Sequence, residues 1–153
     1  MADVEGLTLR LQRILPGTRE SVFRACTQPD QLTQWWGPHG FTMPRIDLDL
    51  RVGGRYRFAM QPPDGQLFHL AGEFRTIDPP ALLEYTFRWE PPDPEDRETI
   101  VTVSLGDLGQ STEFGLVQAG FATEARRALH EDGWSQSLDR LRDVLSSPEA
   151  ARG

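Results

Sequence analysis

The sequence contains no lysine and no asparagine, and its single cysteine is Cys26. One cysteine excludes a disulfide framework and a zinc site built from cysteine ligands. All 16 basic residues are arginines, and with 23 acidic residues they leave a net charge of −7. Because nucleic-acid binding requires a basic face, this acidic balance argues against nucleic acid as a partner. We attribute the missing lysines and asparagines, whose codons are rich in A and T, to a GC-rich genome.

Long hydrophobic runs are also missing. No stretch of about 18 apolar residues occurs, which argues against a membrane-spanning helix. Residues 1–6 carry two carboxylates and lack the basic-then-apolar pattern of a signal peptide, so we expect a cytoplasmic protein with no membrane partner. The length of 153 residues fits one domain with a sizeable core, which we place at about 7–146 between frayed termini.

Alternation of polar and apolar residues predicts seven strands separated by turn residues. They are expected at residues 6–14, 41–51, 55–61, 66–77, 82–90, 99–105 and 111–118. Two short helices are expected after the first strand, one capped by Thr18 and one running from Pro29 to Trp36.

The C-terminal segment changes to helical periodicity. From about 122 to 146, apolar residues recur at spacings of four, three and four, at Trp134, Leu138, Leu141 and Leu145. Consecutive strands with short turns imply an antiparallel meander, and the apolar face of this sheet must be buried against another element. We therefore predict an α+β helix-grip fold, in which a curved antiparallel seven-stranded sheet wraps around the long C-terminal helix.

The Gly53-Gly54 turn allows a prediction of strand register. A symmetric two-residue loop would pair Leu50 with Arg57 and mix apolar and charged side chains on one face, which a one-sided sheet does not tolerate. A loop of odd length aligns Leu50 with Tyr56 or Phe58 instead. We therefore predict a three-residue loop with a glycine at positive φ, a G1-type bulge.

The predicted inner faces are rich in aromatic residues. Large rings that do not fully interdigitate tend to line a pocket for an apolar ligand, whereas the alternative is plain core packing. The residues predicted to line such a cavity are Trp35, Trp36, Phe41, Tyr56, Phe58, Met60, Tyr85, Phe87, Trp89, Phe114, Leu116, Gln118, Trp134 and Leu138. We expect His39 and His130 at the cavity mouth.

The sequence offers no clear set of catalytic residues. The histidines at 39, 69 and 130 lie 30 and 61 residues apart, without the close pair typical of a zinc site. Tyr56 and Tyr85 are the better chemical candidates, because both are predicted on apolar faces and a buried hydroxyl needs a partner. Cys26 lies on an apolar helix stripe and is expected to be an inert thiol. We expect no catalytic residue, no metal and no other cofactor.

Five segments together carry a family resemblance. They are Trp35-Trp36-Gly37-Pro38-His39-Gly40-Phe41, residues 49–58, Asp78-Pro79-Pro80-Ala81-Leu82, Gly120-Phe121, and Gly133-Trp134 followed by Leu138-Asp139-Arg140-Leu141. In combination they resemble the START-like (SRPBCC) superfamily, and within it the group similar to the C-terminal domain of the activator of the Hsp90 ATPase. The resemblance covers about residues 7–146 and implies a helix-grip fold with a hydrophobic cavity between sheet and C-terminal helix. It implies a bacterial protein but no particular reaction.

One position departs from the pattern of that group. Its members often carry a histidine just before the Gly-Phe pair that opens the last helix, and Gln118 occupies that place here. Glutamine donates and accepts hydrogen bonds but does not titrate, so an acid–base role at this position is in doubt for this chain.

Three functions stay open from the sequence. The favoured one is a module that binds a small hydrophobic ligand without catalysis, because no convincing nucleophile or metal set is present. The second is an enzyme of the cyclase or dehydratase type that acts on a hydrophobic ligand through Tyr56, Tyr85 or a histidine at the mouth. The third, suggested by the family name, is a co-factor of an Hsp90-type chaperone. An exposed edge strand such as 41–51 could also pair in a homodimer.

Overall fold

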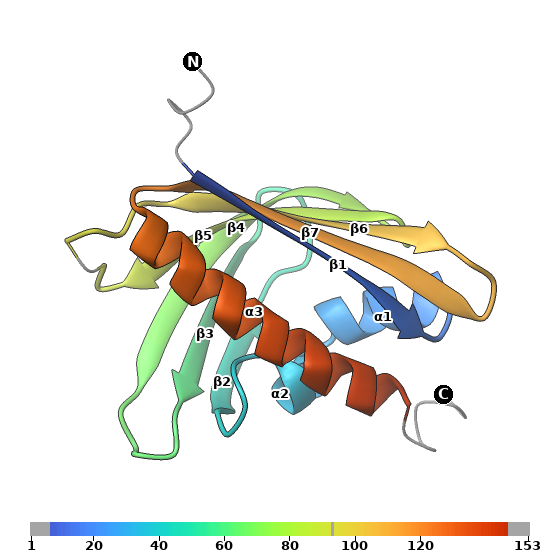
Figure 1. The fold of residues 1–153 in the computed structure, drawn as a ribbon, viewed down its shortest axis with the longest axis horizontal. Coiled ribbons are helices and arrows are strands. Elements are labelled where there is room, and N and C mark those ends of the chain that lie inside the picture. The colour runs from blue at the N-terminus through green and yellow to red at the C-terminus, as the bar shows by residue number, and fades with distance from the viewer. Residues whose placement is uncertain (1–6, 93, 147–153) are drawn as a thin grey trace.

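The computed structural model describes residues 7–92 and 94–146, and within them the chain forms seven strands and three helices (Figure 1). In chain order these are β1 (Leu7–Pro16), α1 (Arg19–Thr27), α2 (Pro29–Trp35), β2 (Thr42–Leu48), β3 (Arg55–Gln61), β4 (Phe68–Asp78), β5 (Leu82–Glu90), β6 (Thr99–Asp107), β7 (Ser111–Phe121) and α3 (Glu124–Leu145). In this described part, no helix has the length and apolar character needed to cross a membrane.

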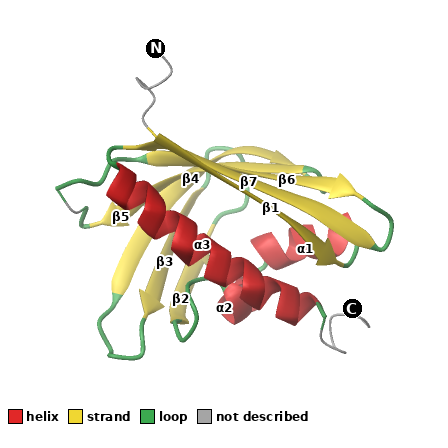
Figure 2. Cartoon of the chain, viewed as in Figure 1, coloured by secondary structure: helices red, strands yellow, loops and turns green. Residues whose placement is uncertain are grey.

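The strands form one antiparallel sheet in the order β1-β7-β6-β5-β4-β3-β2. The chain places β1 beside β7, at the opposite edge from β2, and the two short helices make the connection between these edges. The sheet curves, and α3 crosses it diagonally from the β5 side towards α2 (Figures 1 and 2). The predicted α+β helix-grip fold is therefore confirmed, including the two short helices after the first strand.

Alternating burial explains how the strands and α3 join. In β5 the side chains of Leu83, Tyr85 and Phe87 are buried, while Glu84 and Arg88 on the opposite face are only half-buried; Thr86, on that same face, is buried as well. The predicted apolar face of the last helix is also confirmed, since each of its members is buried against the sheet side. These members are Trp134, Leu138, Leu141 and Leu145. Burying both apolar faces together removes them from water and forms the core.

Helix boundaries follow from side-chain caps. The Thr18 hydroxyl accepts a hydrogen bond from the Ser21 amide at 3.2 Å and begins α1, as predicted. The hydroxyl of Thr123 does the same for the Arg126 amide at 3.1 Å, so α3 begins at Glu124 rather than at 122. Strand β7 continues to Phe121, past the predicted end, because its last residues pair with the start of β1. The predicted first residue of β1, at position 6, lies outside the described residues.

The connection between β2 and β3 is longer than the predicted three-residue loop. Leu48 pairs with Tyr56, and the Asp49 amide donates to the Arg55 carbonyl at 3.0 Å, so residues 50–54 form a longer loop. The predicted parity of the register is right, because apolar residues align with apolar ones. Leu50, however, is exposed and does not pair with Tyr56 or Phe58.

The cause of the longer loop lies on β4. The Gly53 amide donates to the Phe74 carbonyl, and the Phe74 amide donates to the Gly54 carbonyl, both at 2.9 Å. The two glycines therefore bond to β4 instead of closing a tight hairpin. Gly53 has φ +84°, the positive value that was predicted. A Cβ at Gly54 would collide with the Asp49 carbonyl oxygen, which explains why a second glycine stands there.

Candidate functional site

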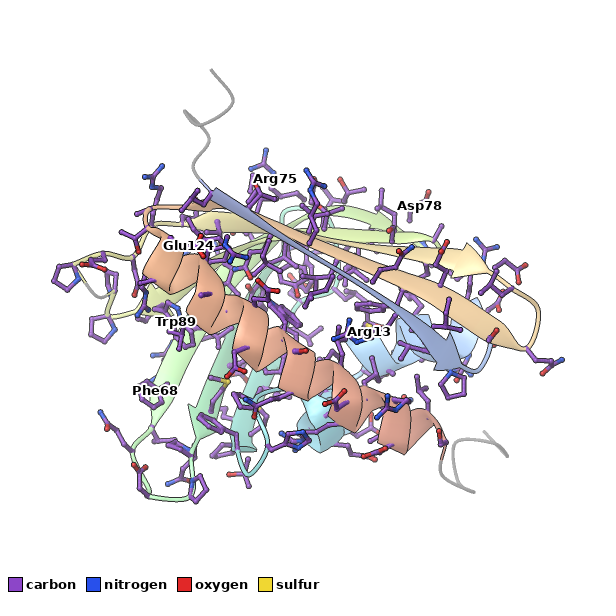
Figure 3. The ribbon with its side chains drawn as sticks, viewed as in Figure 1. Arg13, Phe68, Arg75, Asp78, Trp89 and Glu124 are labelled. Carbon is purple, nitrogen blue, oxygen red and sulfur yellow. The ribbon has the colours of Figure 1, made fainter. Side chains whose placement is uncertain are left out.

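A pocket of about 470 Å³ lies beside the N-terminal half of α3. It is bounded by the ends of β3, β4 and β5, the β3–β4 hairpin and the loop between α2 and β2. Its larger apolar side chains are Trp36, Phe41, Met60, Leu67, Phe68, Leu70, Phe87, Trp89, Leu129 and Trp134. The rings of Phe68 and Trp89 lie 6.4 Å apart, centroid to centroid, on the β4 and β5 part of this wall (Figure 3).

Gly133 is one reason that this space stays open. It lies on the face of α3 that lines the pocket, next to Trp134. A Cβ at this position would meet only the Pro38 ring within 4 Å, at 3.8 Å. The helix backbone therefore forms part of the wall, where a larger side chain would project into the space.

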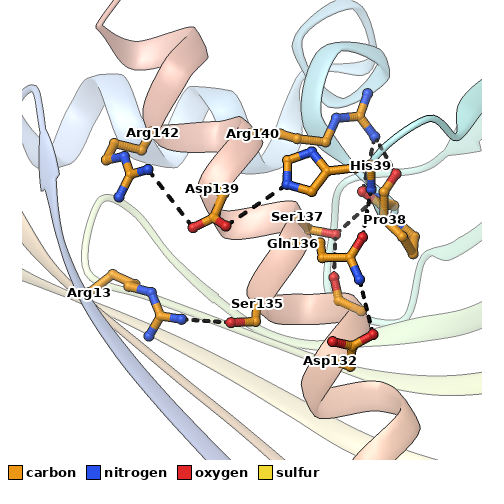
Figure 4. A network of polar contacts seen from close by, with 12 residues as sticks. Arg13, Pro38, His39, Asp132, Ser135, Gln136, Ser137, Asp139, Arg140 and Arg142 are labelled. Atoms are coloured by element: carbon orange, nitrogen blue, oxygen red, sulfur yellow. Dashed lines mark hydrogen bonds and ion pairs between the residues drawn. The ribbon is translucent and has the colours of Figure 1, made fainter.

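The loop between α2 and β2 is fastened to α3 through its main chain (Figure 4). Nη1 of Arg140 donates to the carbonyl oxygens of Gly37 and Pro38, at 2.9 and 3.0 Å. The Gly37 amide donates to the Ser137 hydroxyl at 3.0 Å. Partial burial lowers the pKa of Arg140 from its usual value, yet its guanidinium remains charged. This clamp holds the loop residues that line the pocket against the helix.

His39 lies on the outer side of this clamp. Its amide donates to the Gln136 side-chain oxygen at 3.0 Å, and its Nε2 lies 3.9 Å from an Asp139 carboxylate oxygen (Figure 4). Its side chain is 55% exposed, and it is not among the residues that line the pocket. The structure thus places this histidine at the surface beside α3.

His130, in contrast, lines the pocket and is buried. Its Nε2 accepts a hydrogen bond from the indole Nε1 of Trp89 at 3.1 Å, and the rings of Phe87 and Phe121 contact its other faces. The pKa of His130 is lowered to about 4, mainly by burial and also by the nearby charge of Arg126, while Asp96 opposes the shift. The imidazole is therefore neutral at pH 7, and because Nε2 accepts, its proton is assigned to Nδ1.

An ion pair stands next to this histidine. Nε of Arg126 donates to Oδ1 of Asp96 at 2.7 Å, and Nη2 of the same guanidinium lies 2.7 Å from that oxygen. Both side chains are largely buried, and both residues line the pocket. The pair ties the loop between β5 and β6 to the first turn of α3, and it balances one positive charge with one negative charge.

Gln118 acts as a support for one pocket wall. It is fully buried, its side-chain oxygen accepts from the Trp134 indole at 2.8 Å, and its amide donates to the Thr99 hydroxyl at 2.8 Å. The glutamine uses both its donor and its acceptor to fix the indole ring of Trp134. A titratable side chain is not needed for that task.

The structure divides the residues predicted to line the cavity into two groups. Gathered around the pocket are Trp36, Phe41, Met60, Phe87, Trp89 and Trp134, together with His130 from the predicted mouth. Placed elsewhere in the core are Trp35, Tyr56, Phe58, Tyr85, Phe114, Leu116, Gln118 and Leu138. Trp36 forms a partition between them, because its ring packs edge-on against both Phe58 and Trp134, with centroids 5.3 and 4.9 Å away.

Behind that partition lies a space of only about 20 Å³, lined by Tyr56, Tyr85 and Cys26 among others. The Tyr56 hydroxyl donates to the Thr86 carbonyl oxygen at 2.6 Å. Burial raises the pKa of Tyr56 and of Tyr85 well above the usual value, and it raises the pKa of Cys26 to about 12. The phenols and the thiol are therefore protonated at neutral pH and packed inside the core.

Several pocket residues were not singled out from the sequence. On α3 they are Arg126, Leu129, Gly133 and Ser137, which share a helix face with His130 and Trp134 at helical spacing. That periodicity could have revealed them, had polar residues and glycine been counted with the apolar ones. The remaining ones belong to loops, where no period exists, or to the ends of β4 and β5 next to them: Gly37, Pro38, Gln66, Leu67, Phe68, His69, Leu70, Glu90, Pro91 and Asp96.

Comparison with known proteins gives consistent matches. The model of the family described as Activator of Hsp90 ATPase homolog 1-like protein matches residues 16–146. A solved structure from Chromobacterium violaceum is 29% identical with a TM-score of 0.84, covering 92% of this chain and 97% of that one. The AHSA1 protein from Silicibacter pomeroyi is 28% identical with a TM-score of 0.79, covering 92% and 98%. A Nitrosomonas europaea protein is 27% identical with a TM-score of 0.79, covering 97% and 99%. No curated protein matches the chain.

Proposed function

The chain belongs to the family of Activator of Hsp90 ATPase homolog 1-like proteins, and we propose that it binds a small apolar or aromatic molecule in the pocket beside α3. The helix-grip fold of the family supports a ligand-binding type of module. The observation that carries the finer proposal is the pocket of about 470 Å³ with its largely apolar wall, to which Trp and Phe rings contribute. Such a volume is in the range of pockets that bind drug-sized ligands.

The rim of the pocket supports the same proposal. Leu67 and Phe68 on the β3–β4 hairpin and Leu129 on α3 line the pocket, yet they remain 46%, 39% and 53% exposed. Large apolar side chains gathered at an opening mark a surface that gains free energy when something covers it. An apolar ligand that fills the pocket would cover part of these three side chains.

A substitution at Gly133 tests the proposal. Gly133→Phe places a ring in the pocket, whereas Gly133→Ala adds only a methyl group that has room against Pro38. The neutral probe N-phenyl-1-naphthylamine, followed by its fluorescence, should bind the wild type and Gly133→Ala within about twofold. It should bind Gly133→Phe at least about tenfold more weakly, an expected loss of about 1.4 kcal/mol. Equal binding by Gly133→Phe, with the thermal unfolding transition retained, would overturn the proposal.

The family name keeps an Hsp90-type chaperone partner as the alternative. That function would use an outer surface, so it predicts that Gly133→Phe and the wild type bind the host Hsp90 homologue equally in calorimetry. The cyclase or dehydratase alternative has less support, because Tyr56 and Tyr85 lie behind Trp36 and the Tyr56 hydroxyl is engaged with the Thr86 carbonyl. We therefore propose binding as the function.

A further inference from the structure

Two residues of α3 that carry hydrogen-bond donors, His130 and Arg126, line the pocket. These residues are four apart on the helix, so their side chains share one face. From their bonding we propose that the ligand carries a carbonyl oxygen, which accepts a hydrogen bond from Nδ1 of His130 beside Nη1 of Arg126. This inference rests on the proposed function and names the chemical class of the ligand.

The donor of His130 follows from its contact with Trp89. An indole nitrogen only donates, so Nε2 of His130 must be the acceptor and Nδ1 carries the hydrogen. Within the described part of the chain, no hydrogen bond uses this Nδ1–H. The residue is 9% exposed, and Phe87, Trp89 and Phe121 surround its ring with apolar faces. Because every buried polar side-chain atom of the described residues has a partner, an unbonded Nδ1 is accessible to solvent, and a ligand acceptor can replace the water there.

The donor of Arg126 has a similar origin. Its Nε and Nη2 both face Oδ1 of Asp96, which leaves the two hydrogens of Nη1 without a protein acceptor in the described residues. The side chain is 19% exposed, so this group is held in place rather than free in solvent. The carboxylate of Asp96 neutralises the charge of Arg126, so a polar ligand oxygen fits this site without a full negative charge.

Three side-chain acceptors in the pocket wall are already engaged within the protein. The Ser137 hydroxyl accepts from the Gly37 amide and donates to the Gly133 carbonyl. The Glu90 carboxylate is paired with Arg57 at 2.7 Å, and Asp96 is paired with Arg126. Away from the exposed rim, the wall therefore offers donors to a ligand but few acceptors, so a ligand acceptor fits it better than a ligand donor.

Two probes of nearly equal shape test the proposal. In 2-acetylnaphthalene a carbonyl oxygen stands where 2-isopropenylnaphthalene has a methylene group. The wild type should bind the ketone about five- to tenfold more tightly than the alkene, the size expected of the net gain from one hydrogen bond. In His130→Phe, which keeps an aromatic ring but has no donor, this preference should fall to below about twofold. Equal affinities in the wild type, or the same preference in His130→Phe, would overturn the inference.

A second measurement covers the case in which His130→Phe does not fold. In wild-type protein with nitrogen-15-labelled histidine, the Nδ1 resonance of His130 should shift when the ketone is added and stay in place with the alkene. Equal shifts with both probes would contradict the inference. The Gly133→Phe variant separates the two proposals: if it weakens both probes but the wild type does not prefer the ketone, only the carbonyl assignment fails. If it weakens neither probe, the proposed function fails as well.

Discussion

The two halves of α3 cover the same sheet in different ways. At the C-terminal half, Leu138 and Leu141 are 1% and 0% exposed, and the helix contacts β1 and α2. At the N-terminal half, Leu129 is exposed, while His130 and Gly133 border the pocket. One helix can thus close a core at one end and leave a space at the other.

The short helices account for the difference. α1 and α2 add the buried side chains of Val22, Leu32 and Trp35 at the closed end, where α1 contacts β6 and β7 and α2 contacts α3. No described helix adds a comparable layer beside the first turns of α3, where the β3–β4 hairpin and the β5–β6 loop stand instead. We infer that the pocket exists because the second layer of helices covers only one end.

The largest expected effect comes from Leu141 in the C-terminal half of α3, compared with Leu129 in the N-terminal half. Leu141→Ala removes a fully buried side chain from the closed end and should lower the free energy of unfolding by about 2–5 kcal/mol. Leu129→Ala truncates a side chain that is 53% exposed at the pocket rim and should change it by less than about 0.5 kcal/mol. Urea unfolding measures both. Similar losses at the two positions would remove the contrast between the ends.

The second prediction concerns pH. Burial lowers the pKa of His130 from its usual 6.5 to about 4, so below pH 6.5 the unfolded chain binds a proton that the folded protein does not. The free energy of unfolding should therefore fall between pH 6.5 and 4, by up to about 3 kcal/mol from this group. His130→Phe should lose that part of the pH dependence. If the free energies of unfolding of the two proteins, measured in urea, depend equally on pH between 6.5 and 4, His130 is not held neutral.

A third prediction concerns the support of Trp134. Gln118→Met keeps the approximate volume but removes the acceptor for the indole and the donor to Thr99. Leaving these buried groups without partners should lower the free energy of unfolding by about 1–3 kcal/mol. Thr99→Val is the matched control, because it removes only one end of the chain of hydrogen bonds and should cost less. Equal costs for both variants would mean that the Trp134 bond contributes little.

The smallest expected effect is that of Gly133→Ala, for which Gly72→Ala provides the contrast. Gly133→Ala should raise the free energy of unfolding by up to about 1 kcal/mol, because alanine favours the helix and its methyl group has room. Gly72→Ala on β4 should lower it, since a Cβ there would collide with the backbone of Thr86. A loss of stability in Gly133→Ala, measured by thermal unfolding, would mean that the pocket end is packed as tightly as the sheet.

Periodicity predicted the core under the C-terminal half of α3 well, but it predicted the residues that line the pocket only in part. The helix face from Trp134 to Leu145 and the inner faces of β5 could be read from the sequence, because a regular period reports burial directly. The same period places Tyr56 and Phe87 on inner faces alike. It does not tell which lies behind Trp36 and which faces the open space, because that depends on how far the short helices extend.

The loops were the least predictable part. Nothing in the sequence around Gly53 indicates that its amide would bond to Phe74 on β4, a contact between residues far apart in the chain. In the same way, the pairing of Asp96 with Arg126 joins a loop to a helix thirty residues later. Contacts of this kind depend on the tertiary structure, which a local pattern does not encode.

The most direct test of the proposed binding pocket is a crystal structure of the wild-type protein grown with 2-acetylnaphthalene. We expect the naphthalene rings between Trp36, Phe87 and Trp134, with the carbonyl oxygen within hydrogen-bond distance of Nδ1 of His130. Side chains that fill the space beside Gly133, or a probe bound only on the outer face of the sheet, would contradict this expectation.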